Sequence, residues 1–176
     1  ELTELAELLD IPVYTTMPGK SAFDERHPLS LGAGSGATTL AARLWLQESD
    51  VLFAVGSSMT RTGYGQQIPP GKLIIHNVAS LEDINKDFAA DIGLPGDAKE
   101  TLKAMIEEVK AQTGENGRRG QTRVGAEVAK AKKQWLEEWM PLLTAQDEPL
   151  NPYRVIWDID RTLDKENSIV THDAGA

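Results

Sequence analysis

The sequence contains no cysteine, which excludes disulfide bridges and metal sites built on thiolates. It also lacks any apolar run near the ~20 residues that a membrane-spanning helix needs, so we expect no membrane partner. No stretch has the pattern of a secretory signal peptide. The expectation from these absences is a soluble, cytoplasmic protein.

Positive charge is scarce as well. The 176 residues carry a formal net charge of −9, and the acidic residues are spread along the chain. A nucleic-acid-binding surface needs clustered lysine and arginine to neutralise phosphates, so we expect no nucleic-acid partner. Hydrophobic residues make up 40% of the chain, which is enough for the core of one full domain.

The stretch 50–58 indicates the fold class. Five apolar residues at 51–55 run without a break and stop at Gly56, which two serines follow. Such a run is typical of a strand that is buried on both faces of a parallel sheet. A helical pattern at 38–48 precedes it, and a second apolar run at 73–75 follows it. This alternation predicts an α/β fold with three layers and a Rossmann-like parallel sheet.

Hydrophobic periodicity and turn residues place further elements. Helices are expected at 1–9, 97–113, 124–141 and 152–163, the last with Asn151 as its N-cap and Pro152 at its first position. Strands are expected at 13–16, 72–78, 89–94 and 168–172, and a long loop at 21–37. Ser80 and Asp83 are expected to form the capping box of a short helix.

Composition changes sharply between Gly114 and Gly125, where four glycines and three arginines fall within twelve residues. Such a segment is typical of an exposed linker. We therefore predict a central Rossmann-like domain at 1–113, a linker and helix at 114–148, and the truncated start of a further domain at 149–176. The chain begins inside a helical pattern and stops just after a strand-like run, so we expect a fragment of a longer polypeptide.

Two loops are candidate ligand sites, and the first is rich in glycine. Gly32, Gly34 and Gly36 precede the predicted helix at 38–48. Small residues at such a place let a phosphate approach the backbone amides of a helix N-terminus. No buried apolar strand precedes these glycines, however, so a plain flexible turn is the alternative.

The second candidate site lies at the carboxyl ends of two predicted strands. Gly56, Ser57 and Arg61 follow the central strand, and Asn77 ends the next one. Hydroxyl groups and an arginine at this edge can hold a phosphate or a carboxylate, and a solvated loop is the alternative. Nucleotide-binding folds often place an acidic residue near Asn77 to bind a ribose hydroxyl, and this chain has none there. The three histidines have no metal-like spacing.

A series of short segments then resembles a known family. The segments are 5–16, 19–20, 22–23, 27–29, 31–32, 48–56, 74–76, 84–86 and 96–98. In order and spacing they resemble the middle domain of thiamine-diphosphate-dependent enzymes of the acetolactate synthase and pyruvate oxidase group, over residues 5–110. Residues 151–152 and 169–175 are similar to the entry into the pyrophosphate-binding domain that follows in this family.

The resemblance implies a three-domain parent enzyme that acts on 2-oxo acids or related acyl donors by carbon–carbon lyase or ligase chemistry. Thiamine diphosphate and Mg²⁺ would be held mostly by the parent's other domains, because this chain has no Gly-Asp-Gly segment. Only Asp173 and Gly175 match the loop that leads toward the cofactor, so the fragment alone is expected to be inactive. Its partners would be the other domains of the polypeptide, in a homodimer or homotetramer.

Some middle domains of this family bind FAD or ADP. FAD-binding members show Gly-Met-His-Gly where this chain has 35–38, Arg-Phe-Asp-Asp-Arg where it has 58–62, and an acidic strand end where it has Val78 and Ser80. These departures argue against bound FAD. They predict a domain that keeps the nucleotide-binding fold, has lost nucleotide binding and serves as a spacer.

Two alternatives stay open. One is a nucleotide-binding module for ADP, FAD or NAD that uses both candidate loops. The other is a free-standing NAD-consuming domain of deoxyhypusine-synthase or sirtuin type. The missing acidic residue for a ribose counts against the second alternative.

Overall fold

A computed structural model describes residues 1–34, 38–61, 63 and 67–171. The chain forms two compact units, Glu1–Lys132 and Lys133–Ala176. Within the described ranges, no helix is long and apolar enough to cross a membrane.

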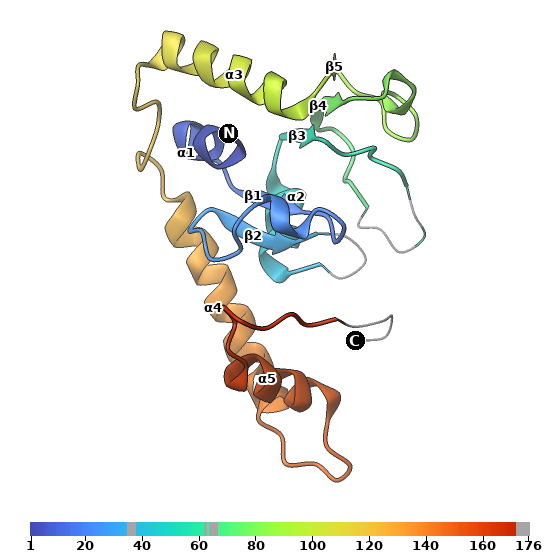
Figure 1. The fold of residues 1–176 in the computed structure, drawn as a ribbon, viewed down its shortest axis with the longest axis vertical. Helices are drawn as coiled ribbons and strands as arrows, with labels where there is room; N and C mark the ends of the chain where they lie inside the picture. The colour runs from blue at the N-terminus through green and yellow to red at the C-terminus, as the bar shows by residue number, and fades with distance from the viewer. Residues whose placement is uncertain (35–37, 62, 64–66, 172–176) are drawn as a thin grey trace. The chain divides into compact units, whose positions relative to one another are not determined.

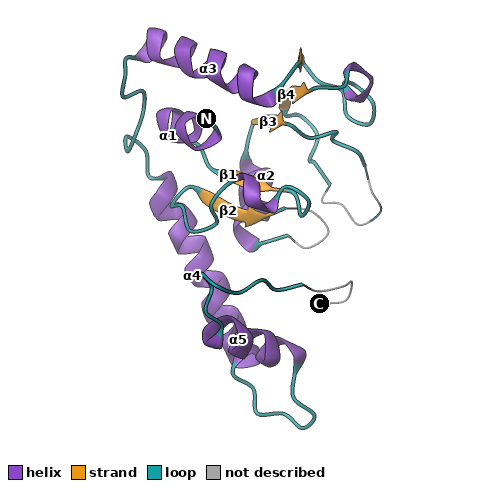
Figure 2. Cartoon of the chain, viewed as in Figure 1, coloured by secondary structure: helices purple, strands orange, loops and turns teal. Residues whose placement is uncertain are grey.

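Among its described residues, the first unit contains five strands in two sheets, drawn in orange in Figure 2. Strand β1 (Val13–Thr15) pairs with β2 (Ser30–Ala33). Strands β3 (Val51–Val55), β4 (Leu73–Val78) and β5 (Ile92–Pro95) form the second sheet in the order β3-β4-β5. Every pair is parallel, which confirms the predicted α/β fold class with a parallel sheet. The sequence predicted one sheet, whereas the described strands lie in two.

One apolar core joins the three-stranded sheet to two helices, α1 (Leu2–Leu9) and α3 (Ala98–Thr113) (Figure 1). Its buried members are Leu5 and Leu8 of α1 and Leu102 and Ile106 of α3, with Phe53 and Val55 of β3 packed against them. Full burial of a leucine or isoleucine side chain is worth about 1.5–3 kcal/mol, so this cluster is a main source of stability. At the rim, Lys110 Nζ donates to Glu4 Oε1 at 2.8 Å.

A second core joins the two-stranded sheet to α2 (Leu40–Glu48) and the first turns of α4 (Val124–Leu143). Leu31 of β2 packs there against small residues of α2, and Val128 and Ala131 of α4 complete the cluster. Thr39 begins α2 as its N-cap, because its hydroxyl oxygen accepts from Ala42 N at 3.2 Å. The helix predicted at 38–48 is therefore present, over Leu40–Glu48.

The glycine- and arginine-rich segment 114–123 is exposed but anchored by hydrogen bonds. Arg118 N donates to Leu8 O at 2.6 Å, at the end of α1. Asp10 Oδ2 accepts from both the backbone N (2.8 Å) and the hydroxyl (2.6 Å) of Thr122. The segment is thus held to α1, which lies far from it in the sequence.

The second unit holds the rest of α4 and α5 (Pro152–Thr162). Asn151 Oδ1 accepts from Tyr153 N at 3.0 Å, and Pro152 takes the first helical position, as predicted. Trp139 connects the helices, since its ring centroid lies 5.8 Å from that of Trp135 and 5.1 Å from that of Tyr153. No residue of α5 is buried.

Four sequence-based expectations about local structure are corrected. The loop predicted at 21–37 contains β2, which forms because β1 offers a parallel partner. Helix α4 continues past Pro141 to Leu143, and Thr144 N still donates to Met140 O at 3.0 Å, so the proline interrupts the backbone bonding only locally.

The other two corrections concern ends of elements. Ser80 makes no side-chain capping bond to the short 3-10 helix η2 (Leu81–Asp83), so the predicted capping box is absent there. No strand forms at 168–171, where Ile169 is 95% exposed. A single extended segment needs a neighbouring strand to satisfy its backbone, and none pairs with it in the described residues.

Candidate functional site

The carboxyl ends of β3 and β4 bring several predicted site residues together. Gly56 ends β3 with a φ of +63°, a conformation that residues with a Cβ rarely adopt. Its N–H donates to Asn77 O at 2.9 Å, which ties the two strand ends. Ser57 follows directly, and its hydroxyl oxygen accepts from Met59 N at 3.2 Å. Gly56, Ser57 and Asn77 therefore lie together at one edge of the sheet, and their role in binding stays a prediction.

His76 belongs to this group, although sequence reasoning did not assign it a role. Its side chain is 1% exposed, and its Nε2 lies 2.7 Å from Ser57 O. A carbonyl oxygen only accepts, so Nε2 is the donor of this hydrogen bond. Within the described ranges Nδ1 has no hydrogen-bond partner. The only signal in the sequence was a histidine next to Asn77 in the mostly apolar run of β4.

Asn77 is fully buried, and its amide fixes the start of α3. Nδ2 donates to Leu94 O (2.8 Å), Gly96 O (3.3 Å) and Thr101 Oγ1 (3.1 Å). The amide thus holds β5 and α3 to β4, which is a structural task. Its Oδ1 is buried without a partner among the residues that the structure describes. The role in binding that the sequence suggested stays a prediction.

Arg61, which was predicted to bind an anion, contacts Asp87 and Phe88. Its backbone N donates to Asp87 Oδ2 at 2.8 Å, and its Nη2 lies 3.4 Å from Asp87 O. The guanidinium carbon also lies 4.9 Å from the centroid of the Phe88 ring, within the range of a cation–π contact. The Asp87–Phe88 pair was not singled out from the sequence, because its link to Arg61 spans 26 residues.

The glycine-rich candidate loop belongs to the two-stranded sheet, and protein side chains fill the space beside its glycines. A Cβ on Gly32, whose φ is +80°, would lie 2.9 Å from Thr39 Cγ2. A Cβ on Gly34 would lie 2.5 Å from Cδ2 of the Tyr14 ring. Close packing thus accounts for both glycines. Gly36 lies outside the described residues, as do Asp173 and Gly175.

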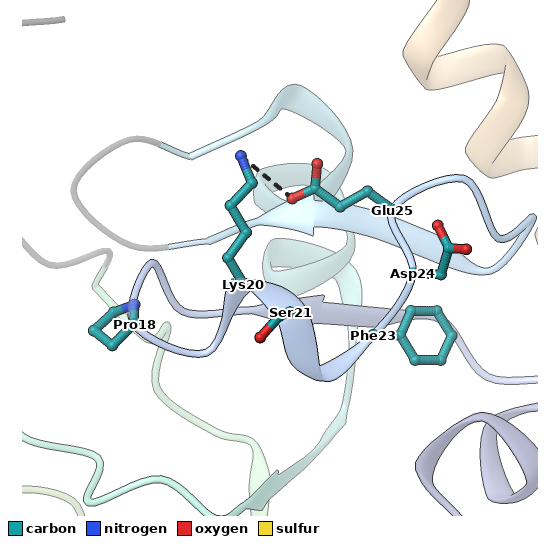
Figure 3. Close-up of a pocket in the computed structure, with 6 residues that line it drawn as sticks. All are labelled: Pro18, Lys20, Ser21, Phe23, Asp24 and Glu25. Atoms are coloured by element: carbon teal, nitrogen blue, oxygen red, sulfur yellow. Dashed lines mark ion pairs between the residues drawn. The ribbon is translucent and has the colours of Figure 1, made fainter. Parts of the chain in front are cut away.

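A shallow surface depression of about 640 Å³ lies at the turn that follows β1 (Figure 3). Phe23 is buried there, and Lys20 forms an ion pair with Glu25 across 3.6 Å. Asp24 accepts hydrogen bonds from the Arg26 side chain, which lower its pKa to about 2. The charged side chains that line this depression therefore already have ion-pair partners, and they form no preorganised ligand set.

The described residues do not fit a metal–diphosphate centre. Within 1–34, 38–61, 63 and 67–171, no group of three or more histidine and acidic side chains could hold a metal ion. A Mg²⁺ ion needs several converging oxygen ligands.

Comparison with known proteins identifies relatives along the whole chain. Residues 1–105 match the family described as thiamine pyrophosphate enzyme, central domain. The chain is 33% identical to a probable acetolactate synthase large subunit of Methanocaldococcus jannaschii, over 99% of this chain and 29% of that protein. A protein of the same description from Methanococcus aeolicus is 30% identical over 99% of this chain and 30% of its own length.

A bacterial relative covers a shorter part. The acetolactate synthase large subunit of Corynebacterium glutamicum is 35% identical over 65% of this chain and 19% of that protein. The chain thus spans less than a third of the length of the relatives it matches. The family match covers more than half of the chain, and the parallel α/β fold agrees with it. This chain therefore belongs to the thiamine pyrophosphate enzymes, whose central domain it carries.

Proposed function

We propose that this chain is the central domain of an acetolactate synthase-like enzyme that acts on 2-oxo acids. The observation that supports this most strongly is the similarity to two archaeal acetolactate synthase large subunits along 99% of the chain. That similarity continues past residue 105, where the match to the central-domain family ends. The alternative of a free-standing NAD-consuming domain has no comparable support.

In this proposal the chemistry resides in other domains of the same polypeptide. Thiamine diphosphate, bound there with Mg²⁺, supplies the carbanion chemistry, while the protein positions the reacting groups. The central domain acts as a rigid spacer whose cores and ion pairs fix the distance between its neighbours. The enzyme works in the cytoplasm as a homodimer or homotetramer. Our division into 1–113, 114–148 and 149–176 is part of this proposal.

The spacer role includes the proposal that this domain takes no FAD or ADP. Three observations support it. Thr39 and Tyr14 occupy the space beside Gly32 and Gly34 that a phosphate would need. The Arg61 guanidinium is engaged by residues 87–88. The Asn77 amide nitrogen already donates hydrogen bonds to Leu94 O, Gly96 O and the Thr101 hydroxyl.

The experiment that tests the function compares two proteins. The full-length polypeptide that contains this chain is expected to form acetolactate from pyruvate only when thiamine diphosphate and Mg²⁺ are added. The 176-residue chain alone is expected to form none under the same conditions. A full-length polypeptide that is folded, binds thiamine diphosphate and still forms no product from pyruvate or another 2-oxo acid contradicts the proposal.

One observation favours a second function, a nucleotide-binding module. His76 Nδ1 and Asn77 Oδ1 are buried polar atoms without hydrogen-bond partners in the described residues, at the sheet edge where α/β folds bind ligands. A thermal melt of the 176-residue chain with ADP, FAD or NAD distinguishes a nucleotide-binding module from a spacer that binds no nucleotide. Ligand at 100 times its Kd stabilises a protein by about 2.7 kcal/mol, which raises the midpoint clearly. We expect no rise, and a rise would establish the module instead.

A further inference from the structure

Segment 114–123 contains the only asparagine of this chain that a glycine follows, at Asn116 and Gly117. The segment connects α3 to α4 and passes α1 on its way (Figure 1). Asn116 is exposed in a turn, and Gly117 has a φ of +54°. A Cβ on Gly117 would lie 2.3 Å from Leu8 O, so the contact with α1 requires a glycine at this position.

The same glycine makes the asparagine before it reactive. Asparagine is a chemically labile residue, because the backbone nitrogen of the next residue can attack its side-chain carbonyl carbon. A side chain on the next residue shields that nitrogen, and Gly117 has none. The packing of the segment against α1 and the reactivity of Asn116 therefore have one cause.

The other asparagines are less open to this attack. Their side chains already form hydrogen bonds within the described residues, whereas the Asn116 amide forms none there. The residues that follow them are also larger than glycine, and in one case the next residue is a proline without an N–H. These four residues are Asn77, Asn85, Asn151 and Asn167.

We propose that Asn116 is a modification site, where asparagine converts to aspartate and isoaspartate without an enzyme, at a rate set by the anchoring of segment 114–123. In the first step Gly117 N bonds to Asn116 Cγ, the bond from Cγ to Nδ2 breaks, and Nδ2 leaves as ammonia with the proton of Gly117 N. Water then hydrolyses the succinimide ring at either of its carbonyl groups, which leaves aspartate or isoaspartate at position 116. The net change is uptake of water and release of ammonia, with no oxidant or reductant.

The hydrogen bonds of the anchored segment oppose the first step. Gly117 N donates to Gly114 O at 3.0 Å, and an N–H in a hydrogen bond gives up its proton less readily. Arg119 N donates to Asn116 O at 3.2 Å, which fixes the backbone beside the reacting atoms. Ring closure requires rotation of that backbone, so the reaction proceeds in molecules whose segment is transiently released from α1.

The product weakens the anchoring that delays its formation. In isoaspartate the main chain runs through the side chain, which adds a methylene group to the backbone just before Gly117. The Arg118 N–H, which donates to Leu8 O at 2.6 Å, is thereby displaced from its acceptor. A new negative charge also lies beside Glu115. Modified molecules should therefore be cut at Arg118 or Arg119 sooner than unmodified ones in limited proteolysis.

Mass spectrometry of the 176-residue chain tests the proposal, after ageing in heavy-oxygen water at mildly alkaline pH and digestion in acid. An acid formed from an amide takes up heavy oxygen, and fragmentation by electron transfer distinguishes isoaspartate from aspartate. In guanidinium chloride, Asn116 should convert on the order of 10-fold faster than Asn167, the exposed asparagine before a serine that is the internal control. In the folded chain, isoaspartate at position 116 should still accumulate, but more slowly than in the denaturant.

Variants of Asp10 test whether the anchoring sets the rate. Asp10→Ala removes the acceptor that holds Thr122 and should speed the conversion of Asn116 on the order of 10-fold, with Asn167 unchanged. Asp10→Asn, which keeps an acceptor oxygen, is the matched control and should speed it less. If Asp10→Ala does not fold, the comparison between the folded and the denatured unchanged chain decides the question.

Three outcomes overturn the proposal. The first is the absence of isoaspartate at position 116 in the folded chain by the time Asn167 has converted. The second is an equal rate at Asn116 in the folded and the denatured chain, which would show that the anchoring does not control the reaction. The third is a folded Asp10→Ala variant that fails to speed Asn116, or that speeds Asn116 and Asn167 alike, because release of segment 114–123 should act on Asn116 alone.

Discussion

Two segments of this chain differ in opposite ways from what their composition suggests. The segment 114–123 has almost nothing apolar, yet it is tied to α1 by hydrogen bonds from Arg118 and Thr122. Helix α5 has a regular apolar face, yet none of its residues is buried. Polar composition therefore did not prevent anchoring, and apolar periodicity did not ensure burial.

The reason is that each property depends on partners far away in the sequence. The hydrogen bonds between Asp10 and Thr122 join residues that are 112 positions apart. A carboxylate with two good donors can hold an exposed segment without any apolar contact. An amphipathic helix, in contrast, gains its stability mainly from the surface it covers. Predictions that alter one segment at a time can sharpen or break this comparison.

The largest effect is expected for Gly117→Ala in the anchored segment. Gly117 has a φ of +54°, and a Cβ there would lie 2.3 Å from Leu8 O, the acceptor of the Arg118 N–H. Backbone strain and the clash together should lower the free energy of unfolding by about 2–4 kcal/mol, measured by urea denaturation. Gly120→Ala is the control, because φ is +63° there with nothing within 4 Å. It should cost about 1–2 kcal/mol. Equal costs would show that segment 114–123 does not rest on α1.

The next effect concerns the carboxylate that receives both bonds. Asp10→Ala should lower the free energy of unfolding by about 1.5–3 kcal/mol, because two hydrogen bonds to a charged group are lost. Asp10→Asn is the control, since asparagine tolerates the left-handed φ of 53° and keeps an acceptor oxygen. It should cost less than the alanine variant. Limited proteolysis of Asp10→Ala should also cut at Arg118, Arg119 or Arg123 sooner than in the unchanged chain.

Much of the fold followed from local patterns in the sequence. The run 51–55 predicted β3, and the cap Asn151 predicted the start of α5. These signals work because capping and periodicity involve neighbours along the chain. Strand β2 was missed, since Ser30–Ala33 has little strand propensity of its own and forms by pairing with β1.

The candidate site could be predicted only in part, for a similar reason. Gly56, Ser57 and Asn77 come together because the ends of parallel strands meet at one edge of a sheet. The sequence does not show that Arg61 is engaged by Asp87, or that the ring of Tyr14 fills the space beside Gly34. Contacts between side chains that lie far apart in the chain decide whether a loop stays open to a ligand. Whether these residues bind one stays a prediction.

A smaller effect is expected from the ion pair that joins α1 to α3. A hydrogen bond from Lys110 lowers the pKa of Glu4 below its ordinary value of 4.5. The folded-state pKa is the lower one, so the contribution to stability is complete above 4.5 and is lost as the pH falls through the folded-state value. Glu4→Gln removes the carboxylate that titrates. The unfolding midpoint of the variant should therefore fall less than that of the unchanged chain as the pH is lowered, measured as unfolding midpoint against pH. Glu100→Gln is the control, because Glu100 pairs with Lys103 at the same 2.8 Å within one helix. A profile for Glu4→Gln that matches the unchanged chain would exclude the pair as a source of stability.

The smallest effect is expected on the apolar face of α5. Ile156 is 49% exposed, so Ile156→Ser removes little buried surface and should change the free energy of unfolding of the 176-residue chain by no more than about 0.5 kcal/mol. Ile106→Ser is the matched control on another amphipathic helix, where the side chain is 6% exposed. It should cost at least about 2–5 kcal/mol, the cost of emptying a core position. If both substitutions cost the same in urea denaturation, the face of α5 is covered in the folded chain. The contrast between the anchored polar segment and the uncovered apolar helix would then be wrong, because burial would follow periodicity in both helices.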